Sequence, residues 1–346
     1  MRDPRAIARR AARAGTVRTT ACAAVLGLAT ASSGFGCGGA APKAAVAHVE
    51  QGARWQDVFD TTPELLAVLR PTAMRQDKVY GPLLQRVLVA ARDRSRAIAS
   101  TRVLEVVQDT EEVVVGVRPA QRLDEGVEQP AELVMVLRGV PASADPGKVV
   151  DADGGALWSP GPHGAVRELV RERDEHGHPV DASLFELENR TWIIAVGPAR
   201  ARARDVFAHP VSRPELKLDP GALAMIRIDG TSLVQRVHAL QPLGGLAAVG
   251  RKLSSLTATL PPGSNGALQL SFLYAEEDAS AFAEVAARQA IEAIGRKKPE
   301  SLAWLASAKV SRPDRRVLVD LPLPPTLIES LLHAGSAPID FDASAP

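Results

Sequence analysis

Two histidines beside acidic residues form the strongest metal-ligand pattern in the sequence. In the stretch DEHGHPVD, residues 174–181, His176 and His178 could bind a metal ion together with Asp174 or Asp181. Zinc sites need three or four such ligands at suitable spacing, with further hydrogen bonds that orient them. The glycine between the histidines and the proline after them fit a polar turn. The pattern predicts a turn, and a hydrolase site built on His176, His178 and nearby carboxylates is the alternative.

Two further stretches imitate ligand-binding loops but lack required residues. DADGG, residues 151–155, begins like a calcium loop, but Gly155 stands where a fifth-position oxygen ligand is needed. GLAAVGRKL, residues 245–253, imitates a phosphate-binding loop, but Lys252 is displaced by one position and Leu253 stands directly after it in place of a hydroxyl residue. The sequence also contains no GxSxG and no SxxK motif. We therefore expect no cofactor, no metal ion and no enzymatic activity.

The residues around these motifs follow a repeated pattern of strand, turn, strand and helix. Runs rich in β-branched residues occur in pairs joined by short polar segments, and such hairpins indicate antiparallel sheet. A segment with helical character follows each pair. The predicted strand pairs are 111–118 with 131–139, 183–188 with 191–197, 256–260 with 267–274, and 307–311 with 315–323. The predicted helices after them are 145–150, 198–208, 278–297 and 324–335.

These units predict an α+β fold of antiparallel sheets, with helices covering one face. The Pro-rich stretch HPVSRPELKLDPG, residues 209–221, falls between the second and third units. It is predicted to separate two related halves, residues 53–210 and residues 211–335. The last segment, residues 336–346, is predicted to be disordered.

Two helices in this scheme have specific expectations. In TTPELLAVLRP, Thr62 is expected to cap a helix, Pro63 to occupy its first position and Pro71 to end it. In the predicted helix at 278–297, Phe282, Val285, Ala286, Ala293 and Ile294 lie on one side, which we expect to face the sheet.

Basic runs and one tryptophan are the other candidates for contacts with partners. The runs ARARAR, residues 199–204, and GRKK, residues 295–298, are short and have acidic neighbours, so they are predicted to be solvated helix faces. Trp158 lies in a predicted loop stiffened by prolines. It is interpreted either as a contact anchor or as a side chain packed on the core.

The first 36 residues have the features of a secretory signal. Six arginines precede an apolar run at about 20–29, and small residues follow it. The run is shorter than the roughly 20 apolar residues that a membrane-spanning helix needs. Residues 1–36 are therefore predicted to be a signal peptide. Arg9 and Arg10 also suggest a twin-arginine signal, although the usual flanking residues are missing.

Cys37 closes this segment in the sequence GFGC, which resembles a bacterial lipobox. The resemblance implies acylation of Cys37, although Gly34 and Phe35 depart from the usual residues. Two or more acyl chains would hold the protein stably at a bilayer. Residues 37–52 are then a flexible tether. Ordinary cleaved export of a soluble periplasmic protein, and a cytosolic protein, remain the alternatives.

The charge and the cysteine content exclude several kinds of partner and of chemistry. Six of the 41 basic residues and one of the 40 acidic residues precede Cys37, so the remainder has 35 and 39, a net charge of −4. A nucleic-acid partner is therefore not expected. The only other cysteine, Cys22, lies in the predicted signal, so acylation of Cys37 would exclude disulfides and thiol nucleophiles. Aromatic residues make up 4% of the chain, which disfavours a stacking platform for sugars or bases.

Four segments resemble a family of uncharacterised bacterial envelope lipoproteins. They are DKVYGPLL (77–84), ELVMVLRG (132–139), TWIIAVGPARARA (191–203) and RRVLVDLPLPPTLIESLL (315–332). The resemblance implies no established activity and no functional residues. It implies an outer-membrane lipoprotein facing the periplasm or the surface, since no aspartate follows Cys37.

Together these observations predict a non-enzymatic cell-envelope lipoprotein, anchored in the membrane by its lipid. Its expected role is that of a binding or structural module for a protein, a lipid or a wall component. An envelope hydrolase using His176 and His178 is the alternative.

Overall fold

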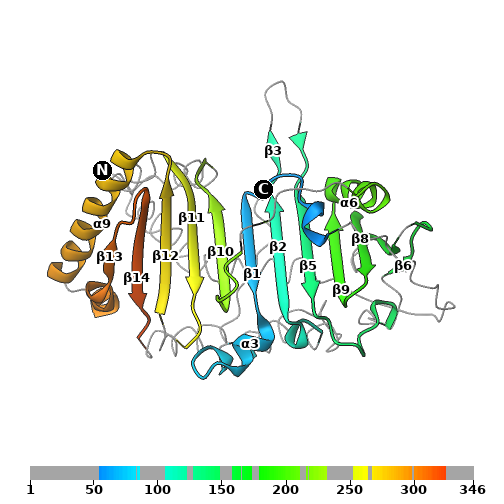
Figure 1. Cartoon of the computed structure of the whole chain (residues 1–346), viewed down its shortest axis with the longest axis horizontal. Helices are drawn as coiled ribbons and strands as arrows, with labels where there is room; N and C mark the ends of the chain where they lie inside the picture. Colours follow the sequence, from blue (N-terminus) through cyan, green and yellow to red (C-terminus); the bar gives the residue numbers. More distant parts are fainter. Residues whose placement is uncertain are drawn as a thin grey trace, which may run out of the picture.

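The computed structural model of the chain describes residues 54–82, 84–85, 106–122, 128–148, 158–164, 166–173, 179–210, 216, 218–231, 252–263, 267–297 and 300–324. Its main feature is one antiparallel sheet of 12 strands, in the order β13-β14-β12-β11-β10-β1-β2-β5-β9-β8-β7-β6. Figure 1 shows these strands side by side across the molecule.

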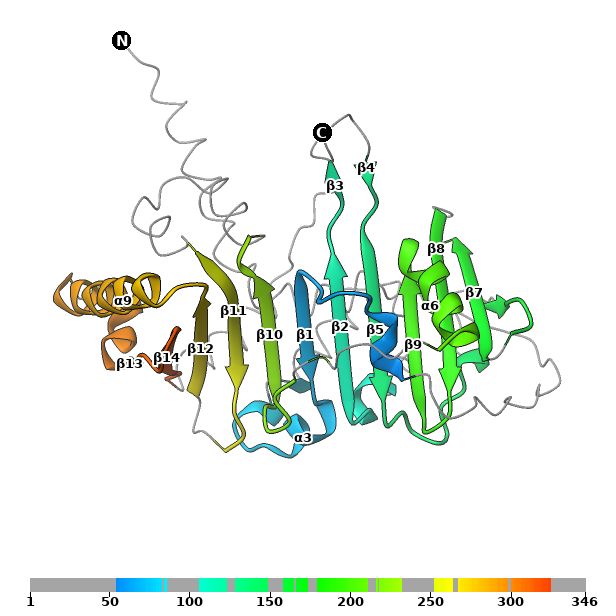
Figure 2. The same ribbon diagram turned by 45° about the horizontal axis from the view of Figure 1, so that its top comes forward.

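The strands are short to medium in length, as is usual in globular proteins. Those of the large sheet are β1 (Leu65–Leu69), β2 (Glu112–Arg118), β5 (Glu132–Arg138), β6 (Ser159–Pro160), β7 (Arg167–Arg173), β8 (Pro179–Leu187), β9 (Thr191–Val196), β10 (Ala224–Asp229), β11 (Leu253–Leu260), β12 (Ala267–Tyr274), β13 (Lys309–Ser311) and β14 (Arg316–Pro322). A separate two-stranded sheet pairs β3 (Gln121–Arg122) with β4 (Glu128–Gln129). In Figure 2 it extends beyond β2 and β5.

Helices are few in the part of the chain that the structure describes. The α-helices with defined bounds are α3 (Pro71–Gln76), α6 (Pro198–Ala208) and α9 (Glu277–Lys297), and short helical stretches also occur at 80–82, 84–85 and 106–109. The 3₁₀ helices are η2 (Trp55–Val58), η5 (Pro146–Lys148) and η6 (Glu300–Ser307).

The predicted fold class, antiparallel sheets of repeated strand–turn–strand–helix units with helices on one face, was wrong. β10 pairs with β1 on one side and with β11 on the other, so strands from both predicted halves belong to one sheet. β10 had not been predicted, because its sequence AMIRID follows the Pro-rich stretch and contains both Arg227 and Asp229. Because β10 was missing from the prediction, nothing in the predicted pattern joined the strands of the first half to those of the second.

The first predicted helix was also wrong, because Leu65–Leu69 forms strand β1. A short apolar run does not distinguish a buried helix from a buried strand. Here the strand lies in the middle of the sheet, where both faces are covered, and Leu66 and Val68 are almost fully buried. Pro71 does not end a helix but begins α3, where its missing N–H costs nothing.

The register of the strands divides the side chains of the large sheet into two faces. We call the face that includes Ala67 the α9 face, and its central row of side chains is apolar from one side of the sheet to the other. That row runs through Leu169, Leu184, Ile194, Met135, Val115, Ala67, Ile226, Ala258, Leu270, Val319 and Val310. Such a row can be buried along its whole length.

The opposite face, which includes Leu66, changes character at the centre of the sheet. We call it the α6 face. Its corresponding row runs through Val170, Ser183, Ala195, Val134, Gly116, Leu66, Arg227, Thr257, Ser271, Leu318 and Ser311. The half on β1 to β9 is therefore largely apolar, whereas the half on β10 to β14 is largely polar. An antiparallel sheet can have one polar face because its strands alternate inward and outward side chains.

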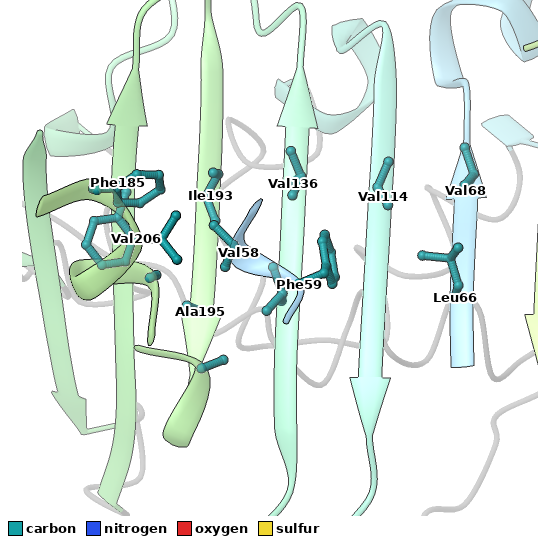
Figure 3. Packing of buried hydrophobic residues seen from close by; sticks show 14 of the residues in the cluster. Val58, Phe59, Leu66, Val68, Val114, Val136, Phe185, Ile193, Ala195 and Val206 are labelled. Carbon is teal, nitrogen blue, oxygen red and sulfur yellow. The ribbon is translucent and has the colours of Figure 1, made fainter. Parts of the chain in front are cut away.

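The apolar half of the α6 face is covered by α6 and η2. Ala199, Ala203, Val206 and Phe207 of α6 are buried against this half. Val58 and Phe59, at the end of η2, pack on the same cluster. Figure 3 shows Val206, Val58 and Phe59 lying over the part of the sheet that carries Phe185, Ile193 and Val136. Phe185 and Phe207 lie with ring centroids 5.1 Å apart, a favourable aromatic contact.

The helix α9 covers the α9 face at the other end of the sheet, so the two long helices lie on opposite faces. Ala279, Ala283 and Ile291 of α9 pack with residues of β12 and β14. The predicted extent of this helix, 278–297, is confirmed by its bounds, Glu277–Lys297. Its predicted orientation was wrong, because Phe282 is 56% exposed and Val285 is 53% exposed. The close approach to the sheet is made by alanines, since large side chains would hold the helix away.

Because of this orientation, we expect substitutions at neighbouring positions of α9 to differ in their effect on stability. We expect Ala283→Asp to lower the melting temperature strongly, because Ala283 is 2% exposed and a buried charge would have no partner. Phe282→Asp is expected to change stability by less than about 0.5 kcal/mol, as is usual for exposed positions. Thermal melts of both variants test this. An equal loss in the two variants would show that Phe282 is buried.

Candidate functional site

Three clusters of arginines and carboxylates surround the apolar half of the α6 face. Each is centred on a carboxylate that is at least nine-tenths buried, namely Glu112, Glu132 or Glu168. Buried carboxylates are stable as ions only when they are paired and hydrogen-bonded. The geometry of these partners decides whether a cluster stabilises the fold or can bind something else.

The Glu112 cluster joins three strands. Arg70, at the end of β1, donates from Nε and Nη2 to Glu112 Oε2 at 3.0 and 2.8 Å. Arg138 of β5 donates to the other oxygen of Glu112, and Arg70 also donates to the carbonyl of Ala222 just before β10. The guanidinium of Arg138 lies 5.3 Å from the centre of the Trp55 ring, in cation–π geometry. Both oxygens of Glu112 are thus used to hold β1, β2, β5 and η2 together.

The Glu132 cluster joins the start of β5 to α6. Arg202 of α6 donates to Glu132 Oε2 at 2.7 Å and to the carbonyl of Val58 at 3.0 Å. Arg118 of β2, opposite Glu132 in the register, donates to the same carboxylate and to Asp60. Two guanidinium groups are balanced by two carboxylates, so the cluster has no excess charge.

The pKa of Asp60 reflects this environment. Burial of the carboxyl group raises its pKa, but the hydrogen bond from Arg118 and the charges of Arg202 and Arg118 lower it more, so the net pKa lies below the usual value. The backbone N–H of Thr61 also donates to Asp60 Oδ1 at 2.8 Å. Asp60 is therefore held as an anion and is poorly suited to act as a general acid near neutral pH.

A shallow hollow with a cavity volume of about 10 Å³, room for about one water molecule, lies beside this cluster. It is bordered by Phe59 and Pro63, which pack over Gly116 of β2, and by Arg118 and Glu132. A Cβ atom on Gly116 would lie 2.4 Å from Phe59 Cε1, so only glycine allows this packing. The hollow is smaller than the roughly 300–1,000 Å³ of ordinary small-molecule sites.

The Glu168 cluster fixes the other flank of α6. Arg204 donates to both oxygens of Glu168, with distances of 2.7–2.9 Å, and the hydroxyl of Ser183 donates to the same carboxylate. The hydrogen bond and charge of Glu168 raise the pKa of Arg204. Arg200, one helical turn before Arg204, forms an ion pair with Asp181. The carboxylate that accepts from Ser183 is therefore shared with Arg204 of α6, and it joins the helix to β7 and β8.

The Glu132 and Glu168 clusters correct the prediction for the run ARARAR. Arg200 and Arg202 have side chains only 16% and 17% exposed, and Arg204 is 38% exposed. They do not form a solvated face, because each reaches a carboxylate on a strand of the sheet. Alternation with alanine was the signal for this arrangement, since Ala199 and Ala203 bring the helix close enough for the arginines to reach.

The other predicted sites have different outcomes. Trp158 is 6% exposed and packs in the core of the α9 face, which confirms the core interpretation. Asp181 is described, and its carboxylate is engaged by Arg200. Lys252 forms an ion pair with Glu276, and Leu253 belongs to β11. The residues outside the described part of the chain are Cys37, Asp174, His176, His178, 151–155 and 245–251.

The polar half of the α6 face is the other candidate surface, and sequence reasoning missed it. We use this name for eight side chains on β10 to β14. They are Arg227, Thr257, Gln269, Ser271, Lys309, Ser311, Arg316 and Asp320. Lys309, Ser311 and Arg316 are exposed, and the other five are partly exposed. Among the described helices, none packs on this half of the face.

Neither metal binding nor membrane crossing is indicated by the described ranges. Their His, Cys, Asp and Glu side chains form no group of three or more that could hold a metal ion. No helix in these ranges is long and apolar enough to cross a bilayer.

Comparisons with known proteins leave the family of the chain open. No protein-family model matches it, and no curated protein matches it. It is similar to the solved structure described as "Structure of crystal form I of TP0453", with 9% sequence identity and a TM-score of 0.42. The match covers 82% of this chain and 97% of that chain. A likeness of this degree assigns neither a family nor a function.

The Glu132 cluster makes a quantitative prediction about stability. Glu132→Gln removes the carboxylate between Arg118 and Arg202, so we expect a loss of about 3 kcal/mol in the free energy of unfolding. Glu111→Gln is the matched control, because Glu111 pairs with Arg190 at an exposed position. The control should lose less than about 1 kcal/mol. Urea unfolding measures both, and equal losses would contradict a structural role for the cluster.

Proposed function

We propose that the protein is a non-enzymatic lipoprotein of the cell envelope that holds a wall component on the polar half of the α6 face. The observation that supports this proposal is the change of the α6 face from apolar to polar at the pairing of β1 with β10. The apolar half is used for packing α6 and η2. The polar half presents hydroxyl, amide and charged groups at the regular spacing of strands.

The composition of the polar half favours a polar polymer over a protein or a lipid. Protein interfaces are enriched in aromatic residues and Met and depleted of Lys, Ser and Asp in their core. The side chains of the α6 face on β10 to β14 include no aromatic residue, and Lys309, Ser311 and Asp320 lie there beside the partly exposed Leu273 and Leu318. A wall polymer with peptide branches offers carboxylates, amines and amides, which can hydrogen-bond to both charged and neutral side chains of this surface.

The paired state of the buried charges supports a non-enzymatic role. A catalytic acid or base needs a proton that it can exchange near neutral pH. Glu132 and Glu168 each accept hydrogen bonds from arginines instead. The alternative, a hydrolase using His176 and His178, gains no support from Asp181, because Arg200 already binds that carboxylate.

A lipid on Cys37 would hold the folded domain near the membrane. Residues 38–52 would then be a flexible spacer with a root-mean-square length of about 20 Å, given roughly 5–6 Å times the square root of the residue number. That reach suits a domain that contacts a wall layer while it stays anchored.

Binding to isolated wall material tests the role of the polar half. The full chain is expected to sediment with purified peptidoglycan sacculi. Lys309→Glu with Arg316→Glu should weaken this binding by about tenfold, because two exposed charge contacts are worth about 0.2–1 kcal/mol each and become repulsive toward carboxylates.

The matched control for this experiment reverses two exposed charges elsewhere, with Lys148→Glu and Arg190→Glu. It should bind sacculi like the parent chain. If the parent chain does not sediment, or if both double variants lose binding equally, the polar half is not the binding surface.

The anchor is tested separately. We expect mass spectrometry of the native protein to find acylated Cys37 at the N-terminus, and Cys37→Ser to move the chain from the membrane fraction to the soluble fraction. A native N-terminus at another residue, or a Cys37 without acyl chains, would exclude the lipid anchor while leaving the wall-binding experiment unaffected.

A further inference from the structure

The strand β13 lies at one end of the large sheet among the described strands. It has three residues, Lys309–Ser311, and it pairs with β14 on one side. An edge strand presents backbone groups to which another strand can pair. The shortness of β13 limits such pairing. The helix α9, which lies beside β13 in Figure 1, limits it further.

The backbone groups of Val310 point toward the free side of β13. The N–H of Tyr274 donates to the carbonyl of Arg315, which places the hydrogen-bonded pairs of β12 and β14 at every second position from there. Leu270 and Val319 form one of these pairs, so the backbone groups of Val319 point toward β12. Val310 lies opposite Val319 on the other side, and its own backbone groups therefore point away from β14.

Arg288 of α9 lies at the free side of β13, where the backbone groups of Val310 point. Its Nη2 donates to the carbonyl oxygen of Val310 at 2.8 Å. The same guanidinium donates to Glu284 Oε1 at 2.8 Å, and Glu284 Oε2 accepts from Nε of Arg312 at 3.0 Å. Glu284 thus holds an arginine from the helix and an arginine from the loop after β13. Its hydrogen bonds with Arg288 and Arg312 lower its pKa, so it stays ionised well below neutral pH.

We propose that Arg288 closes the β13 edge, and that its release opens this edge to β13 of a second copy of the same chain. Two antiparallel strands related by a two-fold axis at Val310 would exchange two hydrogen bonds, N–H to C=O in each direction. Lys309 would lie opposite Ser311 of the other copy, so the two lysines do not face each other directly.

The opposite end of the sheet lacks this self-complementary arrangement. Its last described strand, β6, has two residues, Ser159 and Pro160. Proline has no N–H to donate, so it protects an edge without any guard from a helix. The β13 edge has no proline among its three residues and depends on the contact with α9.

The test compares association of the parent chain and Arg288→Ala by analytical ultracentrifugation over a range of concentrations. We expect the weight-average mass of Arg288→Ala to rise toward twice that of the monomer at concentrations where the parent chain shows a smaller rise. Hydrogen exchange of the Val310 amide should slow as this variant associates. Glu284→Gln, which leaves Arg288 in place without its carboxylate, should give an intermediate effect and provides a second route if Arg288→Ala unfolds.

Two further double variants and one control variant identify the contact. Val310→Pro in the Arg288→Ala background should restore the mass of the parent chain, because it removes the outward N–H without removing a hydrogen bond to β14. Phe282→Ser in the same background tests the exposed apolar side of α9 and should leave the association unchanged. Arg190→Ala, which removes an arginine with the same 52% side-chain exposure, should behave like the parent chain.

Three outcomes would overturn the proposal. The first is an Arg288→Ala chain that is folded in a thermal melt but no more associated than the parent. The second is association that persists in the Val310→Pro background. The third is association that is abolished by Phe282→Ser, which would assign the contact to the apolar side of α9.

Discussion

The pairing of β1 with β10 is the interaction on which the rest of the architecture depends. Five residue pairs, from Leu65 opposite Ile228 to Leu69 opposite Ala224, join strands that are more than 150 residues apart in the chain. The ladder is extended at both ends by the bonds from Arg70 N–H to Leu223 C=O and from Asp229 N–H to Glu64 C=O. Because such distant strands pay the entropy of a long closed loop, the pairing must be supported by burial and by side chains such as Arg70.

This pairing also sets where the sheet changes chemistry. On the α9 face, Ala67 and Ile226 continue one apolar row across the junction, whereas on the α6 face Leu66 is followed by Arg227. A register shift of one residue would place Arg227 among the apolar side chains of the α9 face. The same ladder therefore fixes both the continuity of the core and the position of the polar half that we propose as a binding surface.

Local sequence patterns were sufficient for much of the secondary structure but not for the fold. The turn around Asn189 was predicted from polar residues between apolar runs, and Asn189 and Arg190 do adopt positive φ values there. The strands at 111–118 and 131–139 were predicted because they are runs rich in β-branched residues, and β2 and β5 confirm them. In contrast, the order of 12 strands depends on distant pairings, and no local pattern in Leu65–Leu69 specifies β10 as a neighbour.

The candidate surfaces were missed for a related reason. The arginines at 200, 202 and 204 look solvated in sequence, because their carboxylate partners come from strands and loops up to about 140 residues away. The side chains of the polar half are also spread over five strands, from Arg227 to Asp320. Phe282 was placed on the wrong side of α9 because apolar size suggested burial, whereas a helix packed closely on a sheet favours alanine at the contact.

The two helices show how close packing and long polar side chains work together in this protein. Ala199 and Ala203 bring α6 onto one face, and Ala279 and Ala283 bring α9 onto the other. At such short separations an arginine on the flank of the helix can span the gap and bind a group of the sheet. In α6 the acceptors are the carboxylates Glu132 and Glu168, whereas in α9 the acceptor is a backbone carbonyl of an edge strand. An arginine that binds a carboxylate fixes the helix on the sheet. An arginine that binds a backbone carbonyl of an edge strand also occupies the group to which another strand would bind. The same residue type can therefore stabilise one end of the sheet and close the other.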